Sequence, residues 1–199
     1  MRRKIDRKKQ IREVATKLFS KCGYDKVTIK EISTEVGITE PALYRHFKSK
    51  ASIYEAALVS IESQVDFEDL FEELQNSEDL QYILTSLAEH IIKFFNANED
   101  LYRLLLYSTL KGHSRANEVY KIVRGSYIEF LAKQFDRLFA IGKIIEKKND
   151  IIARCFIGMV FDCSLGTTLW KNFQIKNYTP EEIIANNIPI YIRGLSVNE

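Results

Sequence analysis

Residues 28–47 encode two short helices that are separated by a single glycine. Thr28 and Glu31 have the T-x-x-E spacing of a capping box, which predicts that the first helix begins at Thr28. Gly37 ends this helix, because a sharp turn requires a residue that tolerates positive φ. Thr39 is suited to cap the second helix, and Pro41 is tolerated within a first helical turn. The sequence therefore predicts one helix over 28–36 and a second over about 40–47.

An amphipathic helix precedes this pair, from about residue 6 to residue 22. Its apolar residues follow the i, i+3, i+4, i+7 pattern of one buried face. Cys22 continues the stripe, so we expect its thiol in the core, and Gly23 follows where a left-handed C-cap belongs. The core residues expected from these three helices are Ile11, Val14, Ala15, Leu18, Phe19, Cys22, Ile29, Ile32, Val36, Leu43 and Phe47.

The rest of the chain also has helical periodicity. Only 3 prolines and 8 glycines are present, and they lie between long periodic segments. Thr179, Pro180 and Glu182 together form a strong helix start, whereas the acidic stretch 62–79 is expected to end in a loop. We expect an all-α fold of about nine helices, the remaining ones lying over 49–61, 77–94, 101–110, 116–139, 148–172 and 179–195.

Several functional classes find no support in the sequence. The three cysteines are scattered and odd in number, which argues against a disulfide framework and fits the reducing cytoplasm. No apolar segment of signal-peptide type follows the basic N-terminus. The most apolar stretch, 151–170, contains Arg154 and Asp162, which favours a buried helix over a membrane span. Gly-rich phosphate loops, H-E-x-x-H and C-x-x-C are missing, so we expect no enzyme and no cofactor or metal.

The charges are distributed unevenly along the chain. Residues 1–52 contain 14 lysines and arginines against 6 acidic residues, whereas residues 53–199 contain 15 against 21. A basic end on an acidic body suggests contact with a polyanion at that end alone. A basic tail that is simply solvated is the alternative, and charge by itself does not decide between them.

A helix, a glycine turn and a short second helix are the parts of a helix-turn-helix, whose second helix enters the DNA major groove. Arg45 suits a bidentate contact with guanine, and Ala42 suits a thymine methyl group. Donors to phosphate oxygens are available at Thr28, Thr39, Tyr44, Lys48 and Lys50. The alternative is a helical hairpin that only packs, with these residues on an ordinary solvated face.

The run TIKEISTEVGITEPALYRHFKSK, residues 28–50, resembles the DNA-binding segment of the TetR family of bacterial repressors. The similarity covers about residues 8–58. It implies that Thr28, Thr39, Tyr44 and Lys50 grip phosphates, and that Ala42, Arg45 and His46 face bases. Glu40 and Pro41 depart from the family pattern, so the preferred DNA sequence should differ from that of better-known relatives.

The resemblance also implies a division into a DNA-binding domain over residues 1–50 and a helical effector-binding and dimerisation domain over 51–199. The family usually forms a two-fold homodimer through its last two long helices, here about 148–172 and 179–195. Such a protein is usually a repressor that binds a palindromic operator in double-stranded DNA. An effector would favour a dimer whose two reading heads no longer match half-sites about 34 Å apart.

Candidate residues for an effector pocket lie in the central and C-terminal helices: His90, Phe94, Tyr107, Phe130, Phe161 and Trp170. They suit an apolar or flat small molecule. Aromatic residues at helical spacing more often belong to a core, and His90 and His113 are expected to be satisfied polar residues. Two rival functions stay open: a helical-bundle enzyme or cofactor carrier that uses the helix-turn-helix as packing, and a regulator that answers a protein partner.

Overall fold

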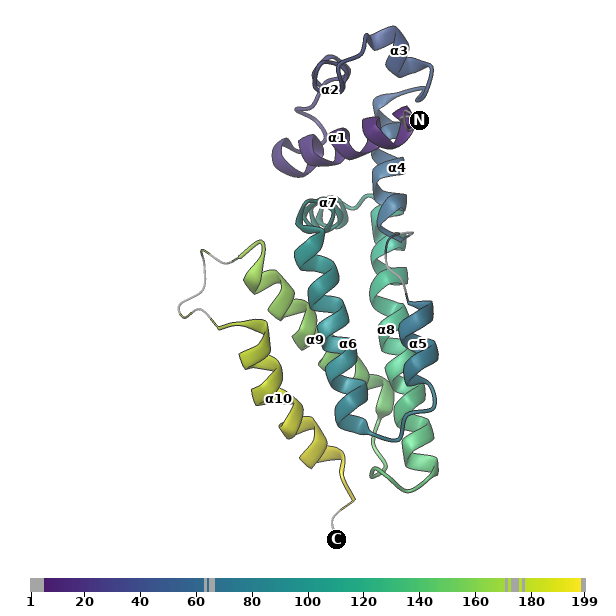
Figure 1. Ribbon diagram of the computed structural model, residues 1–199, viewed down its shortest axis with the longest axis vertical. Coiled ribbons are helices and arrows are strands. Elements are labelled where there is room, and N and C mark those ends of the chain that lie inside the picture. The colour runs from purple at the N-terminus through teal and green to yellow at the C-terminus, as the bar shows by residue number, and fades with distance from the viewer. Residues whose placement is uncertain are drawn as a thin grey trace, which may run out of the picture. The chain divides into compact units, whose positions relative to one another are not determined.

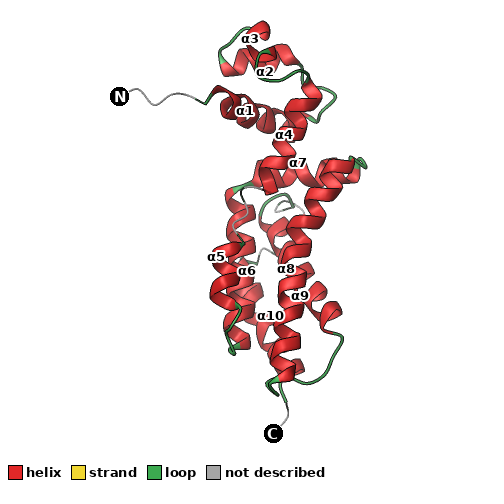
Figure 2. Ribbon diagram, turned by 90° about the vertical axis from the view of Figure 1, so that its right-hand side faces the viewer, coloured by secondary structure: helices red, strands yellow, loops and turns green. Residues whose placement is uncertain are grey.

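The computed structural model describes residues 6–62, 64, 67–170, 172, 176 and 178–197. This part of the chain contains ten helices and no strand beyond an isolated bridge between Ile144 and Ser196, which confirms the all-α class (Figure 1, Figure 2). The helices are α1 (Arg7–Cys22), α2 (Ile29–Val36), α3 (Glu40–Tyr44), α4 (Lys50–Glu62), α5 (Glu68–Leu74), α6 (Leu80–Ala97), α7 (Glu99–Leu110), α8 (Ser114–Ala140), α9 (Asn149–Thr167) and α10 (Pro180–Leu195).

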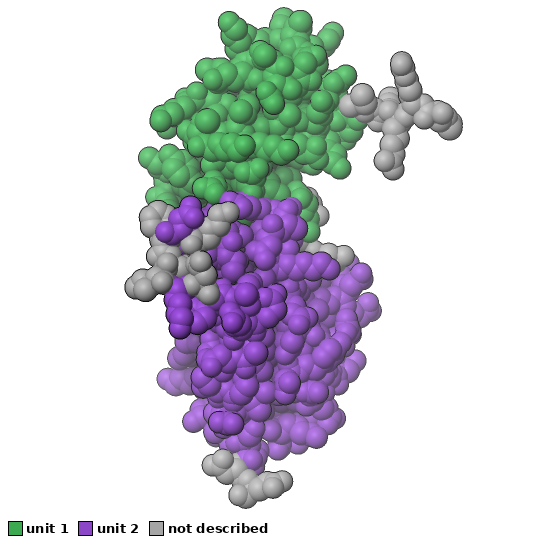
Figure 3. Space-filling view, turned by 60° about the vertical axis from the view of Figure 1, so that its left-hand side comes forward, with its two compact units in different colours: residues 1–64, 100–120 green, residues 65–99, 121–199 purple. Residues whose placement is uncertain are grey.

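Packing divides these helices into two compact units (Figure 3). Unit 1 comprises residues 1–64 and 100–120, and unit 2 comprises residues 65–99 and 121–199. Unit 1 therefore contains α1 to α4, nearly all of α7 and the first turns of α8. The predicted boundary at residue 50 divides the chain by function, whereas the two units are defined by packing alone. The boundary therefore stays a prediction.

The core of unit 1 forms where α1 packs against α2 and α4. Asp6 caps α1 by accepting a hydrogen bond from the Lys9 amide, 3.1 Å away. Ile11, Ala15 and Phe19 are spaced four apart and are fully or almost fully buried. The Phe19 ring meets Tyr54 of α4 edge-on, with 5.1 Å between the ring centroids. Burial of this stripe holds the helix-turn-helix to the long helix α4.

The end of α1 corrects one expectation, because Cys22 is exposed and does not belong to the core. The buried line of α1 advances by four residues at each step, from 11 to 15 to 19, so its next member is position 23. Position 22 is therefore rotated off the buried face. Gly23 occupies position 23 with φ +80° and ψ 158°. This is a positive-φ conformation that suits glycine, but it is not the left-handed helical cap that was expected.

The acidic stretch 62–79 contains a helix that was not predicted, α5, so the described residues form ten helices where about nine were predicted. Residues 63, 65 and 66 of this stretch lie outside the described residues. Phe67 and Phe71 face Tyr127 of α8, with centroid separations of 4.9 and 6.1 Å. Phe71 also stacks on Phe130 at 4.1 Å. These aromatic contacts stabilise a short helix whose acidic residues point to solvent.

Unit 2 is a helical layer structure in which α6 packs against α9 and α10, and α5 lies on α6. Thr179 caps α10 in a capping box with Glu182, which confirms the predicted helix start. The α9 helix ends at Thr167, earlier than the predicted 172; residue 171 lies outside the described residues. Within the described part of the chain, no helix has the length and apolar character needed to cross a membrane.

Candidate nucleic-acid interface

The turn between α2 and α3 is built as the sequence predicts. Gly37 adopts φ +74° in the left-handed region and ends α2. The Ile38 amide donates to the Ser33 carbonyl oxygen at 2.9 Å, which closes the turn. Thr39 then caps α3 by accepting from the Ala42 amide at 3.3 Å. Local hydrogen bonds therefore fix the direction in which α3 leaves α2.

The short helix α3 presents a polar face and buries an apolar one. Leu43 is fully buried and Phe47 is 5% exposed, whereas Tyr44 is 49% exposed. Arg45 and His46 are also exposed, directly after the last residue of α3. The expected α3 extends to Phe47, but the helix ends at Tyr44, and Arg45 is its C-cap. Among the expected base-facing residues, Ala42 is half-buried.

Thr28 is engaged with its own helix. Its hydroxyl accepts from the Glu31 amide at 3.1 Å and donates to the Glu31 carboxylate at 2.9 Å, while its backbone amide donates to the same carboxylate at 2.7 Å. These hydrogen bonds, the backbone one first, lower the pKa of Glu31 below its ordinary value. A phosphate contact by Thr28 would have to form beside this carboxylate.

Because its pKa is lowered, the Glu31 carboxylate is expected to stabilise the fold to a degree that depends on pH. Because the folded-state pKa is lowered, the contribution is fully present above the ordinary value of 4.5 and is lost as the pH falls through the folded value. Glu31→Gln keeps an acceptor but removes the charge, so we expect it to lower stability at pH 7 and to have little effect in acid. Urea unfolding at several pH values measures this difference.

Glu35→Gln is the matched control, because Glu35 is exposed on the same helix outside the cap. A stability loss in Glu31→Gln that stays constant from pH 7 down to acid would contradict the role assigned to the charge.

The Lys50 side chain is hydrogen-bonded within unit 1 and is not a free, exposed phosphate ligand. Its ammonium donates to the carbonyl oxygens of Tyr24 and Val27, both at 2.9 Å, and lies 4.2 Å from the Tyr24 ring centroid. The side chain therefore ties the loop between α1 and α2 to the start of α4. An ammonium has three N–H donors, so one remains after these two bonds. Lys48, by contrast, is exposed.

One basic residue of α1, Lys8, lies next to this surface, although nothing in the sequence singles it out. The Lys8 ammonium lies 5.6 Å from the centroid of the Phe47 ring, next to the end of α3. Sequence periodicity places Lys8 only on the general polar face of α1. The structure thus adds one positive charge to the helix-turn-helix, from a different helix.

The six candidate effector residues are not brought together. Tyr107 lies in unit 1 and is 42% exposed, while the other five lie in unit 2. The His90 Nδ1 atom is 2.8 Å from the Tyr127 hydroxyl, while Phe130 stacks on Phe71, whose ring meets Tyr127 edge-on. Burial raises the pKa of Tyr127.

The remaining candidates of unit 2 have different surroundings from those of His90 and Phe130. Phe94 and Phe161 each meet the Phe95 ring edge-on, with 5.1 Å between the ring centroids. Trp170 is 48% exposed. The assignment of these six residues to an effector pocket therefore stays a prediction, since some of their rings lie in the core whereas Tyr107 and Trp170 are exposed.

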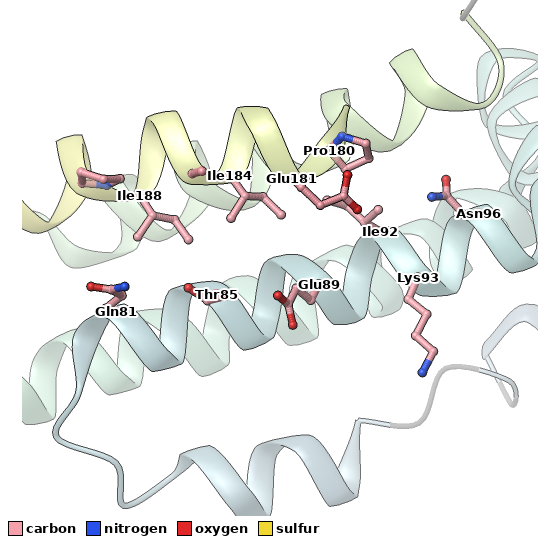
Figure 4. Close-up of a pocket in the computed structure, with 12 residues that line it drawn as sticks. Gln81, Thr85, Glu89, Ile92, Lys93, Asn96, Pro180, Glu181, Ile184 and Ile188 are labelled. Atoms are coloured by element: carbon pink, nitrogen blue, oxygen red, sulfur yellow. The ribbon is translucent and has the colours of Figure 1, made fainter. Parts of the chain in front are cut away.

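A groove of about 620 Å³ lies between α6 and α10 in unit 2, and none of the six candidates lines it. Ile184 and Ile188 project from α10 toward α6, which contributes polar side chains such as Thr85 and Glu89 (Figure 4). Pro189 also lines the groove, and a proline inside a helix cannot donate the usual backbone hydrogen bond. The groove therefore combines an apolar wall with a polar one.

The fold and the exposed face of α3 define a helix-turn-helix protein of the DNA-binding type. Residues 11–57 match the family model described as "Bacterial regulatory proteins, tetR family". The nucleoid occlusion factor SlmA of Aliivibrio fischeri is 27% identical over 164 residues, covering 79% of this chain and 82% of SlmA.

Two solved structures are similar over almost the whole chain. A bacterial regulatory protein in the tetR family from Rhodococcus RHA1 has a TM-score of 0.71 at 16% identity, covering 98% of this chain and 100% of that protein. AibR, solved with isovaleryl coenzyme A and operator DNA, has a TM-score of 0.65 at 20% identity, covering 93% and 97%. Residues 11–57 therefore match the DNA-binding segment of the tetR family of bacterial regulatory proteins, and almost the whole chain has the fold of a solved tetR-family regulator.

Proposed function

We propose that the protein is a cytoplasmic homodimeric repressor that binds a palindromic operator and is released by a small-molecule effector bound in unit 2. The observation that carries the proposal is the face of α3, where Tyr44, Arg45 and His46 are exposed above buried Leu43 and Phe47. The proposed phosphate contacts are Thr28, Thr39, Tyr44 and Lys48, and the proposed base contacts are Ala42, Arg45 and His46. Lys50, which the family resemblance also implies as a phosphate contact, is assigned instead to the loop before α2.

Apolar residues exposed on the last two helices support a dimer. Ile151 on α9 is 49% exposed and Ile190 on α10 is 62% exposed, and Cys155 on α9 is exposed as well. Two copies that cover these residues would also place two helix-turn-helix motifs on one DNA duplex. A single motif offers a small interface, whereas specific DNA binding typically buries about 1,000–2,500 Å² of protein surface.

The groove between α6 and α10 supports an effector of mixed character. Its volume of about 620 Å³ is within the size range of small-molecule sites. AibR, which shares the fold, was solved with an acyl coenzyme A and operator DNA. The contact of His90 with Tyr127, beside the stacked Phe71 and Phe130 rings, is a second candidate location for a flat ligand.

A selection from random duplex DNA, followed by titration of the selected sequences across a salt series, tests the proposal. We expect a palindromic winner, bound by two chains, with a steep salt dependence from phosphate contacts. Weak binding that is indifferent to sequence would contradict it.

Two neighbouring substitutions should separate base contacts from phosphate contacts. Arg45→Ala is expected to relax preference at one or two base pairs and to cost about 1–3 kcal/mol there. Tyr44→Ala is the matched change and should weaken binding to all sequences alike. Repeating the selection with each variant gives the measurement, and an unchanged preference profile for Arg45→Ala would remove Arg45 from the proposed base contacts.

The similarity to SlmA favours a second candidate function, that of a nucleoid occlusion factor. A factor that acts on the nucleoid as a whole would bind at sites spread along the chromosome. A genome-wide binding map distinguishes the two: a few sites beside regulated genes support the repressor, and many dispersed sites without changes in transcription support the occlusion factor.

A further inference from the structure

Unit 1 contains a cavity of about 270 Å³ that is lined by none of the proposed DNA contacts. Its walls come from the loop between α1 and α2, from α4, and from the end of α7 with the turn that follows. The lining residues are Tyr24, Asp25, Ala51, Tyr54, Tyr107, Lys111 and His113, all of which belong to unit 1. Tyr107 thus does line a cavity, but apart from the other candidate effector residues.

One wall of this cavity is a set of aromatic rings fixed in place. Tyr54 meets Tyr24 at 4.8 Å and His113 at 5.2 Å between ring centroids, both edge-on. The Tyr54 hydroxyl forms a short hydrogen bond with Ser108, whose hydroxyl donates to the Leu104 carbonyl oxygen at 2.6 Å. With its hydroxyl engaged, Tyr54 offers its ring to the cavity as a rigid surface.

His113, one of the residues that line the cavity, has an unpaired hydrogen-bonding atom. The Nδ1 atom of His113 is buried and has no hydrogen-bond partner among the described residues. This contradicts the expectation that His113 is a satisfied polar residue. A buried nitrogen without a hydrogen-bond partner is unfavourable, so a ligand that reaches it and supplies a partner gains a directed contact.

The cavity is lined by one acidic and one basic side chain, those of Asp25 and Lys111. The ammonium of Lys50 already lies over the Tyr24 ring, and that of Lys111 lies 5.6 Å from the Tyr107 ring centroid. No acidic group within the described ranges forms a salt bridge with Lys111. An anionic group on a ligand would therefore find an available partner in Lys111, while Asp25 and His113 can accept from a ring N–H or hydroxyl.

We propose that this cavity binds a small planar aromatic carboxylate, with its ring against Tyr24 and Tyr54 and its carboxylate toward Lys111. The size fits, since an apolar cavity of about 150 Å³ accommodates benzene, and 270 Å³ leaves room for a bicyclic ring with a short acidic arm. This site goes beyond the proposed function, which places the effector in unit 2.

Occupancy of the cavity would act on the DNA-binding unit directly. Tyr24 and Asp25 lie in the loop that leads to Thr28 and α2, whereas Ala51 belongs to α4. A ligand that contacts both would bind the folded arrangement of unit 1 and stabilise it in proportion to its affinity. The aromatic acid would thereby restrain the loop that precedes the helix-turn-helix.

Calorimetric titration of the full chain without DNA tests the site with three matched probes: indole-3-acetate, indole and tryptamine. We expect indole-3-acetate to bind, and tryptamine to bind at least about tenfold more weakly because its ammonium meets Lys111. Lys111→Met keeps the apolar stem and should weaken indole-3-acetate about tenfold while leaving indole unchanged.

A second variant blocks the cavity itself. Ala51→Phe is expected to abolish binding of all three probes, whereas Val59→Phe, on an exposed position of the same helix, should bind like the unmodified chain. Circular dichroism melting confirms that each variant folds. The proposal is overturned if no probe binds at millimolar concentration, if tryptamine binds as well as the acid, or if Ala51→Phe or Lys111→Met leaves binding unchanged. None of these outcomes depends on the operator or on the effector of unit 2.

Discussion

Truncation of Leu43 to alanine is expected to abolish binding to every DNA sequence. Leu43 is fully buried, and its helix α3 is only five residues long. Removal of a buried leucine side chain typically costs about 2–5 kcal/mol, because the cavity left behind closes only partly. A helix of one and a half turns has too few internal hydrogen bonds to persist once its packing is lost. The loss should therefore remove Tyr44 and Arg45 from their working positions together.

Hydrogen exchange of backbone amides in the full chain measures this effect where it occurs. We expect faster exchange in α1 to α4 and unchanged exchange in α6, α9 and α10, since the two units are separately packed. Leu110→Ala is the matched control, because Leu110 is 87% exposed in the same unit. If Leu43→Ala exchanged like this control and still bound DNA, the buried platform beneath α3 would not be required.

The helix-turn-helix could be predicted from sequence because its determinants are local. The T-x-x-E spacing at Thr28, the glycine at 37 and the cap at Thr39 each act within four residues, and the structure reproduces all three. The capping box of Thr179 was predictable for the same reason. Signals of this kind need no knowledge of which helix packs against which.

The features that escaped prediction depend on partners far away in the sequence. α5 forms because Phe71 meets Phe130 of α8, and the acidic sequence around it had predicted no helix. Cys22 fits a generic apolar stripe, but α4 and α2 cover only the line through Phe19. The effector candidates were chosen by residue type, and tertiary packing distributes them over separate clusters and both units. His113 could not be recognised as unsatisfied before its surroundings were known.

Replacement of Lys50 by methionine is expected to destabilise unit 1 by about 1.5–3 kcal/mol, the range for hydrogen bonds made by a charged group. The ammonium bonds two carbonyl oxygens at 2.9 Å, those of Tyr24 and Val27, and methionine can donate to neither. The loop before α2 would then lose its tie to α4. Faster amide exchange in that loop and in α2 is the direct measurement.

The salt dependence of DNA binding decides whether Lys50 holds the loop or grips a phosphate. Each phosphate contact contributes about −0.9 to the slope of log K against log salt. We expect Lys50→Met to weaken binding with an unchanged slope, since its ammonium serves the loop. Lys48→Met, an exposed matched change two residues earlier, should make the slope shallower by about one contact and change stability by less than about 0.5 kcal/mol.

The opposite pattern would assign Lys50 differently. A slope reduced by one contact in Lys50→Met, together with unchanged amide exchange, would mean that the ammonium leaves the two carbonyl oxygens when DNA binds. Lys50 would then be the phosphate ligand that the TetR resemblance implies, and the free structure would show its resting position. An ammonium that used only its third N–H for the phosphate would lower both the slope and the stability, because the same side chain would then serve both contacts.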